Sequence, residues 1–256
     1  MKILVCIKQV PDMESKFKID GDGLWYERDE LAWRMNEYDE YGVEQAVQLK
    51  EQTGGDLTVL SIGPERVKET MKKALAMGCD RGVHISDDLC HLRDSFEIGS
   101  MIAEFAKDKG FDMIFTGMQS QDRGSAQVGV IVAELLEMEG ITTIVGFDYH
   151  QHRITVRREL EGGVKAVVEA PLPAVVTCQL GLNIPRYPTL PNIMKAKKKE
   201  MVTVDGDELN RVGSLQQPGA MSVPVKQGGG LYLDGQVEDI AERLLAIIKE
   251  KTSVLA

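Results

Sequence analysis

The residues between positions 116 and 129 have the types and spacing that suit phosphate binding. The stretch TGMQSQDRGSAQVG leaves an apolar run through a glycine, crosses a polar segment and enters a helical pattern near Ser125. We expect the Ser125 hydroxyl to cap that helix. The first backbone N–H groups, those of Ala126, Gln127 and Val128, would then lack partners within the helix. Because such groups and the helix dipole favour an anion, the loop is expected to hold a phosphate group.

The histidines and cysteines of the chain form no recognisable catalytic or metal-binding set. The 116–129 loop matches neither Walker A nor GxGxxG, so an ordinary polar loop with a capped helix remains an alternative. The histidines have no nucleophile at a hydrolase spacing, and the cysteines form no CxxC pair. These residues are His84, His91, His150 and His152, with Cys6, Cys79, Cys90 and Cys178. We therefore expect a nucleotide-binding protein, with no catalytic residue and no metal, rather than a hydrolase.

An alternating series of strands and helices must position the loop. Apolar runs rich in β-branched residues alternate with stripes at helical spacing over the first two-thirds of the chain. Strands are expected at residues 2–7, 57–62, 82–85 and 113–116, and helices around residues 43–47, 67–75, 98–105 and 128–135. Right-handed crossovers then give a mostly parallel, doubly wound, Rossmann-like α/β sheet. Ligands of such sheets bind at the carboxyl ends of the strands, where Cys6 to Lys8, residues 62–64 and the 116–129 loop converge.

The pattern changes after Gly140. Short antiparallel strands are expected at residues 141–150, 153–160, 164–170 and 174–179, with a hairpin at the Gly162–Gly163 pair. Residues 205–230 have the composition of an extended arm, and an amphipathic helix follows from Val237 to Ile248. We expect a nucleotide-binding domain over residues 1–200 and a C-terminal arm and helix over residues 201–256.

The composition is that of a globular protein that carries excess negative charge. The chain has 43% hydrophobic and 27% charged residues and a formal net charge of −10. The negative charge argues against nucleic acid as a partner, because phosphate neutralisation needs a cationic surface. The N-terminal apolar run ends at Lys8 and Pro11, and no later run reaches the roughly 18 residues of a membrane span. A cytoplasmic protein without membrane insertion is therefore expected.

Four separated segments resemble the electron-transfer flavoprotein beta subunit family. They are LPAVVTCQLGLNIPRYPTLPNIMKAKKK (172–199), VRRELEGG (156–163), MNEYDEYGVEQAVQLKE (35–51) and ALAMGCDRGVHI (74–85). The resemblance implies a subunit of a heterodimeric electron carrier, not an enzyme. The alpha subunit would carry the redox FAD, and the beta subunit would hold a structural AMP. Electrons would come from an acyl-CoA or related dehydrogenase and pass to a quinone oxidoreductase or another acceptor.

The resemblance also implies roles for individual residues. AMP contacts carry over to Cys6, Asn36, Asp122, Ala126, Gln127 and Val128. Gly117 and Ser125 join them from the loop considered above. Tyr38 would pack beside the flavin of the alpha subunit, whereas Met13 stands where an aromatic residue is common. Glu159 matches a glutamate that is implicated in freeing the flavin domain to swing. The C-terminal arm and helix would pack on the partner subunit.

Residues 184–199 match the family's recognition loop for dehydrogenases. Leu190 would be held between prolines and inserted into an apolar pocket of the dehydrogenase. The lysines that follow would steer an acidic partner. The alternatives are that Leu190 folds back on its own core and that the lysines form a solvated face. The residues expected to recognise partners are Leu190, Pro191, Ile193, Met194, Lys195 and Glu159.

Two other functions remain open from the sequence. Electron-bifurcating relatives hold a second FAD in place of AMP and take electrons from NADH, commonly with a sequence resembling DTAQVGP at the phosphate helix. This chain has GSAQVGV, which shares AQVG but lacks the acidic residue, the threonine and the proline, so AMP is favoured. The third candidate is a stand-alone adenine-nucleotide-binding signalling module, which would use the same α/β core.

Overall fold

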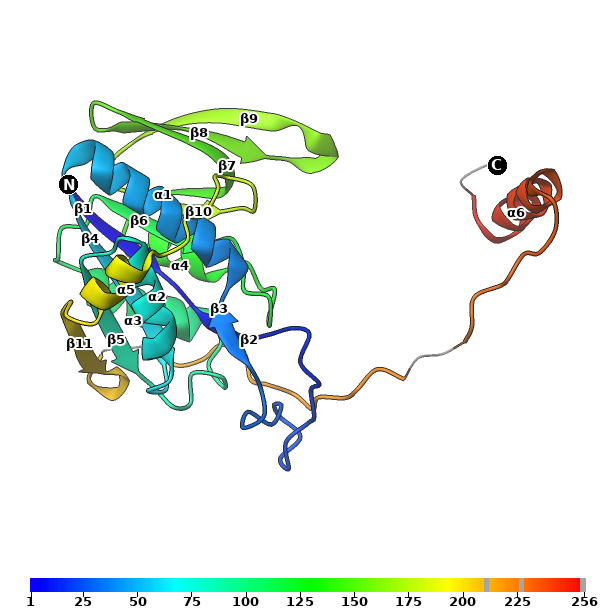
Figure 1. Ribbon diagram of the computed structural model, residues 1–256, viewed down its shortest axis with the longest axis horizontal. Helices are drawn as coiled ribbons and strands as arrows, with labels where there is room; N and C mark the ends of the chain where they lie inside the picture. Colours follow the sequence, from blue (N-terminus) through cyan, green and yellow to red (C-terminus); the bar gives the residue numbers. More distant parts are fainter. Residues whose placement is uncertain (210–211, 226–227, 254–256) are drawn as a thin grey trace. The chain divides into compact units, whose positions relative to one another are not determined.

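A nine-stranded sheet dominates the computed structural model, which describes residues 1–209, 212–225 and 228–253 (Figure 1). The chain divides into two units, residues 1–221 and residues 222–256. The order of the strands across the sheet is β11 (Met201–Asp205), β5 (Arg81–Ser86), β4 (Asp56–Gly63), β1 (Lys2–Cys6), β6 (Met113–Gly117), β10 (Ala174–Cys178), β7 (Glu139–His150), β8 (Arg153–Glu159) and β9 (Lys165–Pro171). All pairs from β11 to β7 are parallel, so the predicted α/β class with a mostly parallel sheet is confirmed.

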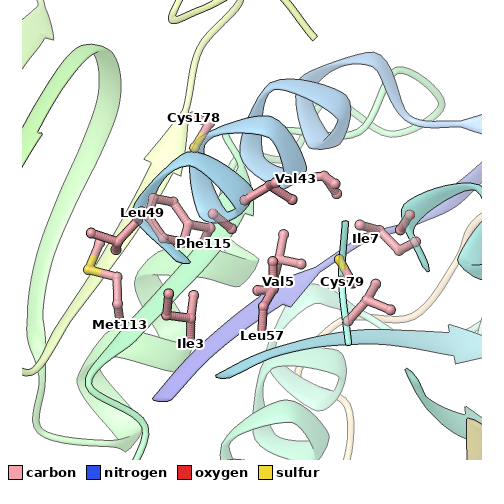
Figure 2. Close-up of a cluster of buried hydrophobic side chains, with 14 of the residues drawn as sticks. Ile3, Val5, Ile7, Val43, Leu49, Leu57, Cys79, Met113, Phe115 and Cys178 are labelled. Carbon is pink, nitrogen blue, oxygen red and sulfur yellow. The ribbon is translucent and has the colours of Figure 1, made fainter. Parts of the chain in front are cut away.

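Helices cover both faces of the parallel strands. The helices α1 (Glu37–Thr53) and α2 (Val67–Met77) share one apolar cluster with the sheet, and α3 (Ser95–Ala106) and α4 (Val128–Leu135) share the other. Figure 2 shows the first cluster, in which Ile3 and Val5 of β1 lie with Val43 and Leu49 of α1. Successive residues of β1 therefore face opposite layers. This double burial explains why the parallel strands read as continuous apolar runs.

The strand order creates a crevice beside β1. From β1 the chain builds outward through β4 to β5, and then returns across the sheet to β6 on the other side of β1. The connections after β1 and β6 therefore diverge at the carboxyl edge of the sheet. Ligands of doubly wound sheets bind at such a point.

The predicted antiparallel extension is correct for three strands and wrong for the fourth. The strands β7, β8 and β9 pair antiparallel, and the Gly162–Gly163 pair lies in the turn between β8 and β9, in the short 3₁₀ helix Glu161–Gly163. Residues 174–178 form β10, which pairs parallel with both β6 and β7. All five residues of β10 are buried, so the strand belongs to the centre of the sheet. Its short apolar run could not distinguish these two positions.

Several elements were not predicted. They are β2 (Gln9–Pro11) and β3 (Trp33–Met35), which pair antiparallel, α5 (Leu190–Ala196), the edge strand β11 and the 3₁₀ helix Gly206–Glu208. Each has seven residues or fewer, which is too short for a clear period. Residues 212–225 contain no helix or strand. The second unit contains α6 (Val237–Lys251), which confirms the predicted amphipathic helix. In the described part of the chain, no helix has the length and apolar character needed to cross a membrane.

Candidate functional site

A cavity opens at the crevice between β1 and β6. The empty space within it is about 880 Å³, which includes the open solvent at its mouth. One part of the wall is apolar and is formed by Leu60, Ile62, Ile98 and Ile102. The remainder is largely polar and includes the loop that follows β6. An apolar pocket with a polar end suits a nucleotide, whose base is flat and weakly polar and whose phosphate is charged.

The polar end includes the start of α4, although not as the sequence suggested. The prediction that Ser125 caps this helix is wrong, because α4 begins at Val128 and the Ser125 hydroxyl accepts from Ser95 Oγ at 3.0 Å. Ala126 has a φ of 53°, which takes the backbone out of the helical path. The N–H groups without helical partners are therefore those of Val128, Gly129 and Val130.

Asn36 ties the loop to the start of α1. Its Nδ2 donates to the Gln119 carbonyl at 2.8 Å and to Asp39 Oδ1 at 3.0 Å, and its Oδ1 accepts from the Gln121 N–H at 3.0 Å. Tyr38 supports the same loop, since its hydroxyl accepts from Gln119 Nε2 at 3.1 Å. Asn36 is buried and lines the cavity, so one side chain shapes the wall and fixes the loop.

Asp39 places a buried carboxylate in the same wall. Its Oδ2 accepts from the Lys8 N–H at 2.6 Å, and its Oδ1 accepts from Asn36. Burial raises the pKa of Asp39 to about 7, although the hydrogen bonds from Asn36 and the Lys8 backbone oppose that shift. Burial also raises the pKa of the neighbouring Cys6 thiol, which is therefore uncharged at neutral pH.

Two cations reach the polar end of the cavity. Lys8 Nζ lies 2.7 Å from Asp122 Oδ1. Arg123 donates to the Arg93 carbonyl at 2.8 Å, and its guanidinium lies 4.7 Å from the centre of the Trp25 ring. Arg123 also donates to the His91 carbonyl through Nη2, and within the described residues no carboxylate forms an ion pair with it, so its positive charge is not balanced by an acidic side chain.

The structure brings most of the predicted cofactor residues into this one wall. Those that line the cavity are Cys6, Asn36, Gly117, Ser125, Ala126, Gln127 and Val128. Asp122 and Tyr38 are not part of the lining. The Asp122 side chain is 4% exposed and pairs with Lys8, and the Tyr38 hydroxyl accepts from Gln119 as described above. A role for each residue in holding a nucleotide stays a prediction.

Comparison with known proteins gives the site its context. A family model described as the electron transfer flavoprotein domain matches residues 23–209. A protein of Bacillus subtilis (strain 168) named electron transfer flavoprotein subunit beta is 36% identical over 261 residues, covering 100% of both chains. Proteins with the same name from Methylophilus methylotrophus and Mus musculus are 36% and 34% identical, over 98% and 88% of this chain and 98% and 92% of theirs. The chain belongs to the electron transfer flavoprotein family. The resemblance to its beta subunits that the sequence suggested is confirmed.

Residues 87–95 form a wall of the cavity that was not predicted from the sequence. Residues 87–95 follow β5 at the same edge of the sheet, and Arg93, Asp94 and Ser95 line the cavity. Asp94 caps α3 by accepting from the Glu97 N–H at 2.8 Å. The spacing Asp-x-x-Glu at Asp94 and Glu97, just before an apolar helical stripe, signals a helix start and could have identified this loop.

The predicted recognition segment contains a helix where a loop was expected. Thr189 caps α5 by accepting from the Asn192 N–H, and Pro191 occupies the first turn, where its missing N–H costs nothing. The Leu190 side chain is 79% exposed, so the alternative in which it folds back on the core is wrong. Ile193 and Met194 are also exposed.

Three of the four lysines at the end of the segment are exposed, as a solvated face requires, and the fourth is held against the body of the protein. Lys195, Lys197 and Lys198 are exposed, but Lys199 Nζ donates to the Leu75 and Cys79 carbonyls at 2.9 and 2.5 Å. Lys199 therefore anchors the segment at the end of α2. The other predicted partner residue, Glu159, lies at the end of β8, where its carboxylate accepts from Gln179 Nε2 at 3.3 Å.

Proposed function

We propose that this chain is the nucleotide-holding subunit of a heterodimeric electron-transfer flavoprotein. It holds an AMP in the cavity at the carboxyl edge of the sheet, and its partner is an alpha subunit that carries FAD. The assembly accepts electrons from an acyl-CoA or related dehydrogenase and passes them to a quinone oxidoreductase or another acceptor. The FAD supplies the electron-carrying chemistry, and the residues of this chain bind and orient.

The shape and charge of the cavity support AMP as the occupant. The apolar wall, which includes Ile62 and Ile98, suits the adenine ring. The N–H groups at the start of α4 suit the phosphate, and Arg123 and Lys8 line the same cavity. Cys6 and Gly117 lie at the ends of β1 and β6, between these two parts. The coincidence of the cavity with the switch in strand order is the observation that carries the proposal.

A second FAD in place of AMP is the alternative, and one feature of the structure favours it. A further hollow adjoins the cavity and shares Asp94, Ser95, Ala126 and Gln127 with it. A dinucleotide is longer than AMP and would extend past the start of α4 into that hollow. In that case NADH would be the electron donor.

Residues 184–199 supply the proposed contact with the dehydrogenase. Leu190 extends from the first turn of α5, and Lys195, Lys197 and Lys198 lie exposed nearby. An apolar anchor beside positive charge suits an apolar pocket in an acidic partner surface. The helix α6 has one apolar stripe and no buried residue, which supports packing of the arm and helix on the alpha subunit.

Counting the bound nucleotides tests the proposal. The chain would be produced together with its alpha subunit, and the purified complex denatured and its nucleotides separated by chromatography. One FAD and one AMP per heterodimer are expected. Two FAD and no AMP would establish the alternative. A stable, colourless homodimer of this chain that binds adenine nucleotide by itself would support the signalling module instead.

Electron transfer tests the docking part separately. Leu190→Ala should raise the KM of the dehydrogenase for the flavoprotein by about 10-fold, which corresponds to roughly 1.4 kcal/mol of docking energy. Flavin content and thermal stability should not change, because the side chain is exposed. An unchanged KM would contradict the role of Leu190.

A further inference from the structure

Arg186 connects the recognition segment to α1 through five hydrogen bonds. Its main-chain N–H and its Nε donate to Glu44 Oε2 at 3.1 and 2.8 Å, and its Nη2 donates to Glu44 Oε1 at 3.1 Å. Its Nη1 and Nη2 donate to the two oxygens of Glu51 at 2.6 and 3.1 Å. A planar guanidinium that serves two carboxylates in this way is satisfied in one orientation only.

Glu44, the main partner of Arg186, is buried. Its side chain is 4% exposed, and Gln48 also donates to it at 2.8 Å. Burial alone would raise the pKa of Glu44, but the hydrogen bonds from Arg186 hold the pKa below its usual value. A carboxylate buried in this way needs its cation, because an unpaired buried charge is costly. The position of Arg186 is therefore fixed by the interior of the molecule.

The apolar residues near Arg186 in the sequence are exposed to solvent. Ile184 and Tyr187, on either side of it, are 89% and 91% exposed. Leu190 and Met194, which lie on α5, are exposed as well. A segment with so many exposed apolar side chains would be expected to pack against the body of the protein unless other contacts fixed its position. Arg186 and Lys199 hold its two ends.

We infer that Arg186 is a positioning residue, which presents Ile184, Tyr187 and Leu190 as one docking surface. This inference rests on the proposed function. The partner that the surface fits has an apolar pocket rimmed by carboxylates, because Lys195, Lys197 and Lys198 are exposed beside the apolar groups. Arg186 does not touch the partner. It lowers the entropy that is lost when the segment becomes ordered on docking.

The test compares a single and a double variant in the complete heterodimer. Arg186→Met leaves the Glu44 carboxylate buried without its cation and is expected to lower stability. The double variant Glu44→Met with Arg186→Met removes both partners, so most of that stability should return. The probe is an acyl-CoA dehydrogenase reduced with butyryl-CoA. Both variants should raise the KM for the flavoprotein by about 10-fold, with kcat changed by less than about twofold and the FAD content unchanged.

Two further measurements separate positioning from folding. Hydrogen exchange of the main-chain amides of residues 183–197 should become faster in both variants. Arg186→Lys keeps the positive charge but loses the planar guanidinium that binds two carboxylates at once. Its KM should therefore lie between those of the wild type and Arg186→Met. The control is Lys18→Met, which removes a surface ion pair with Glu30 in the loop between β2 and β3 and should leave KM unchanged.

The outcomes distinguish this inference from the proposed function. If Leu190→Ala raises KM and the double variant does not, Arg186 has no positioning role and the docking function stands. If neither change alters KM, the docking function itself is wrong. If KM rises only in Arg186→Met and recovers in the double variant together with stability, the role of Arg186 is structural and the inference fails. An equal rise in Lys18→Met would also overturn it.

Discussion

Gly129 should be required for the start of α4 to approach the sheet. A Cβ at this position would lie 2.5 Å from Thr116 Oγ1 and 2.6 Å from Thr177 Cγ2. Thr116 and Thr177 are directly paired neighbours on β6 and β10. Ordinary contacts of a Cβ begin at 3.4 Å, so the added methyl group is about 0.9 and about 0.8 Å too close. Both strands are central, and neither can move away.

Gly129→Ala should therefore displace the first turn of α4. Forcing an extra methyl group into a packed site costs about 1–3 kcal/mol. We expect the free energy of unfolding, measured by urea titration of the heterodimer, to fall by that amount. The displaced N–H groups should also bind phosphate less well, so less AMP should remain after purification. Gly21→Ala is the matched control, because a Cβ there meets nothing within 4 Å.

A compensating background tests the cause of this loss. Thr116→Ala and Thr177→Ser together remove the two colliding atoms, and the serine keeps the hydroxyl that accepts from the Thr143 N–H at 3.0 Å. In that background, Gly129→Ala should cost nothing or even stabilise by up to about 1 kcal/mol, because alanine has fewer conformations in the unfolded chain. An undiminished penalty would refute the steric reasoning. Normal AMP content in the single variant would refute the link to the site.

Three other changes should have measurable effects. Asp39→Asn should remove a pH dependence: the raised pKa of Asp39 means that the folded state holds a proton the unfolded state releases, so wild-type stability falls as pH rises from about 4 to about 7. Parallel urea-unfolding profiles against pH for both proteins would contradict this. Lys199→Met should lower the free energy of unfolding by about 1–3 kcal/mol, since two carbonyls at the end of α2 lose their donor. Lys198→Met, at an exposed neighbour, should not, and equal losses would argue against the anchor. Asn36→Ala should release residues 119–121 and speed their amide hydrogen exchange. Unchanged exchange at these residues would show that the loop is stable without Asn36.

Local patterns were enough to predict the parallel part of the fold. Each inner strand is buried on both faces and each flanking helix on one, so composition and period carry the signal directly. The loop after β6 was predicted for the same reason, because its polar residues interrupt two apolar elements. The exposure of Leu190 was expected from the family resemblance, because the prolines and lysines by themselves left open whether the side chain folds back on the core.

Tertiary structure decided the features that depend on pairing over long sequence separations. β10 lies between β6 and β7, and nothing within its five residues encodes those neighbours. Asn36 holds Gln119 across 83 positions, and Lys199 reaches the end of α2 across 120 or more. The start of α4 moved from Ser125 to Val128 because the backbone turns at Ala126. A sequence period reports which side of an element is buried, whereas the partner that buries it is chosen only when the whole chain has folded.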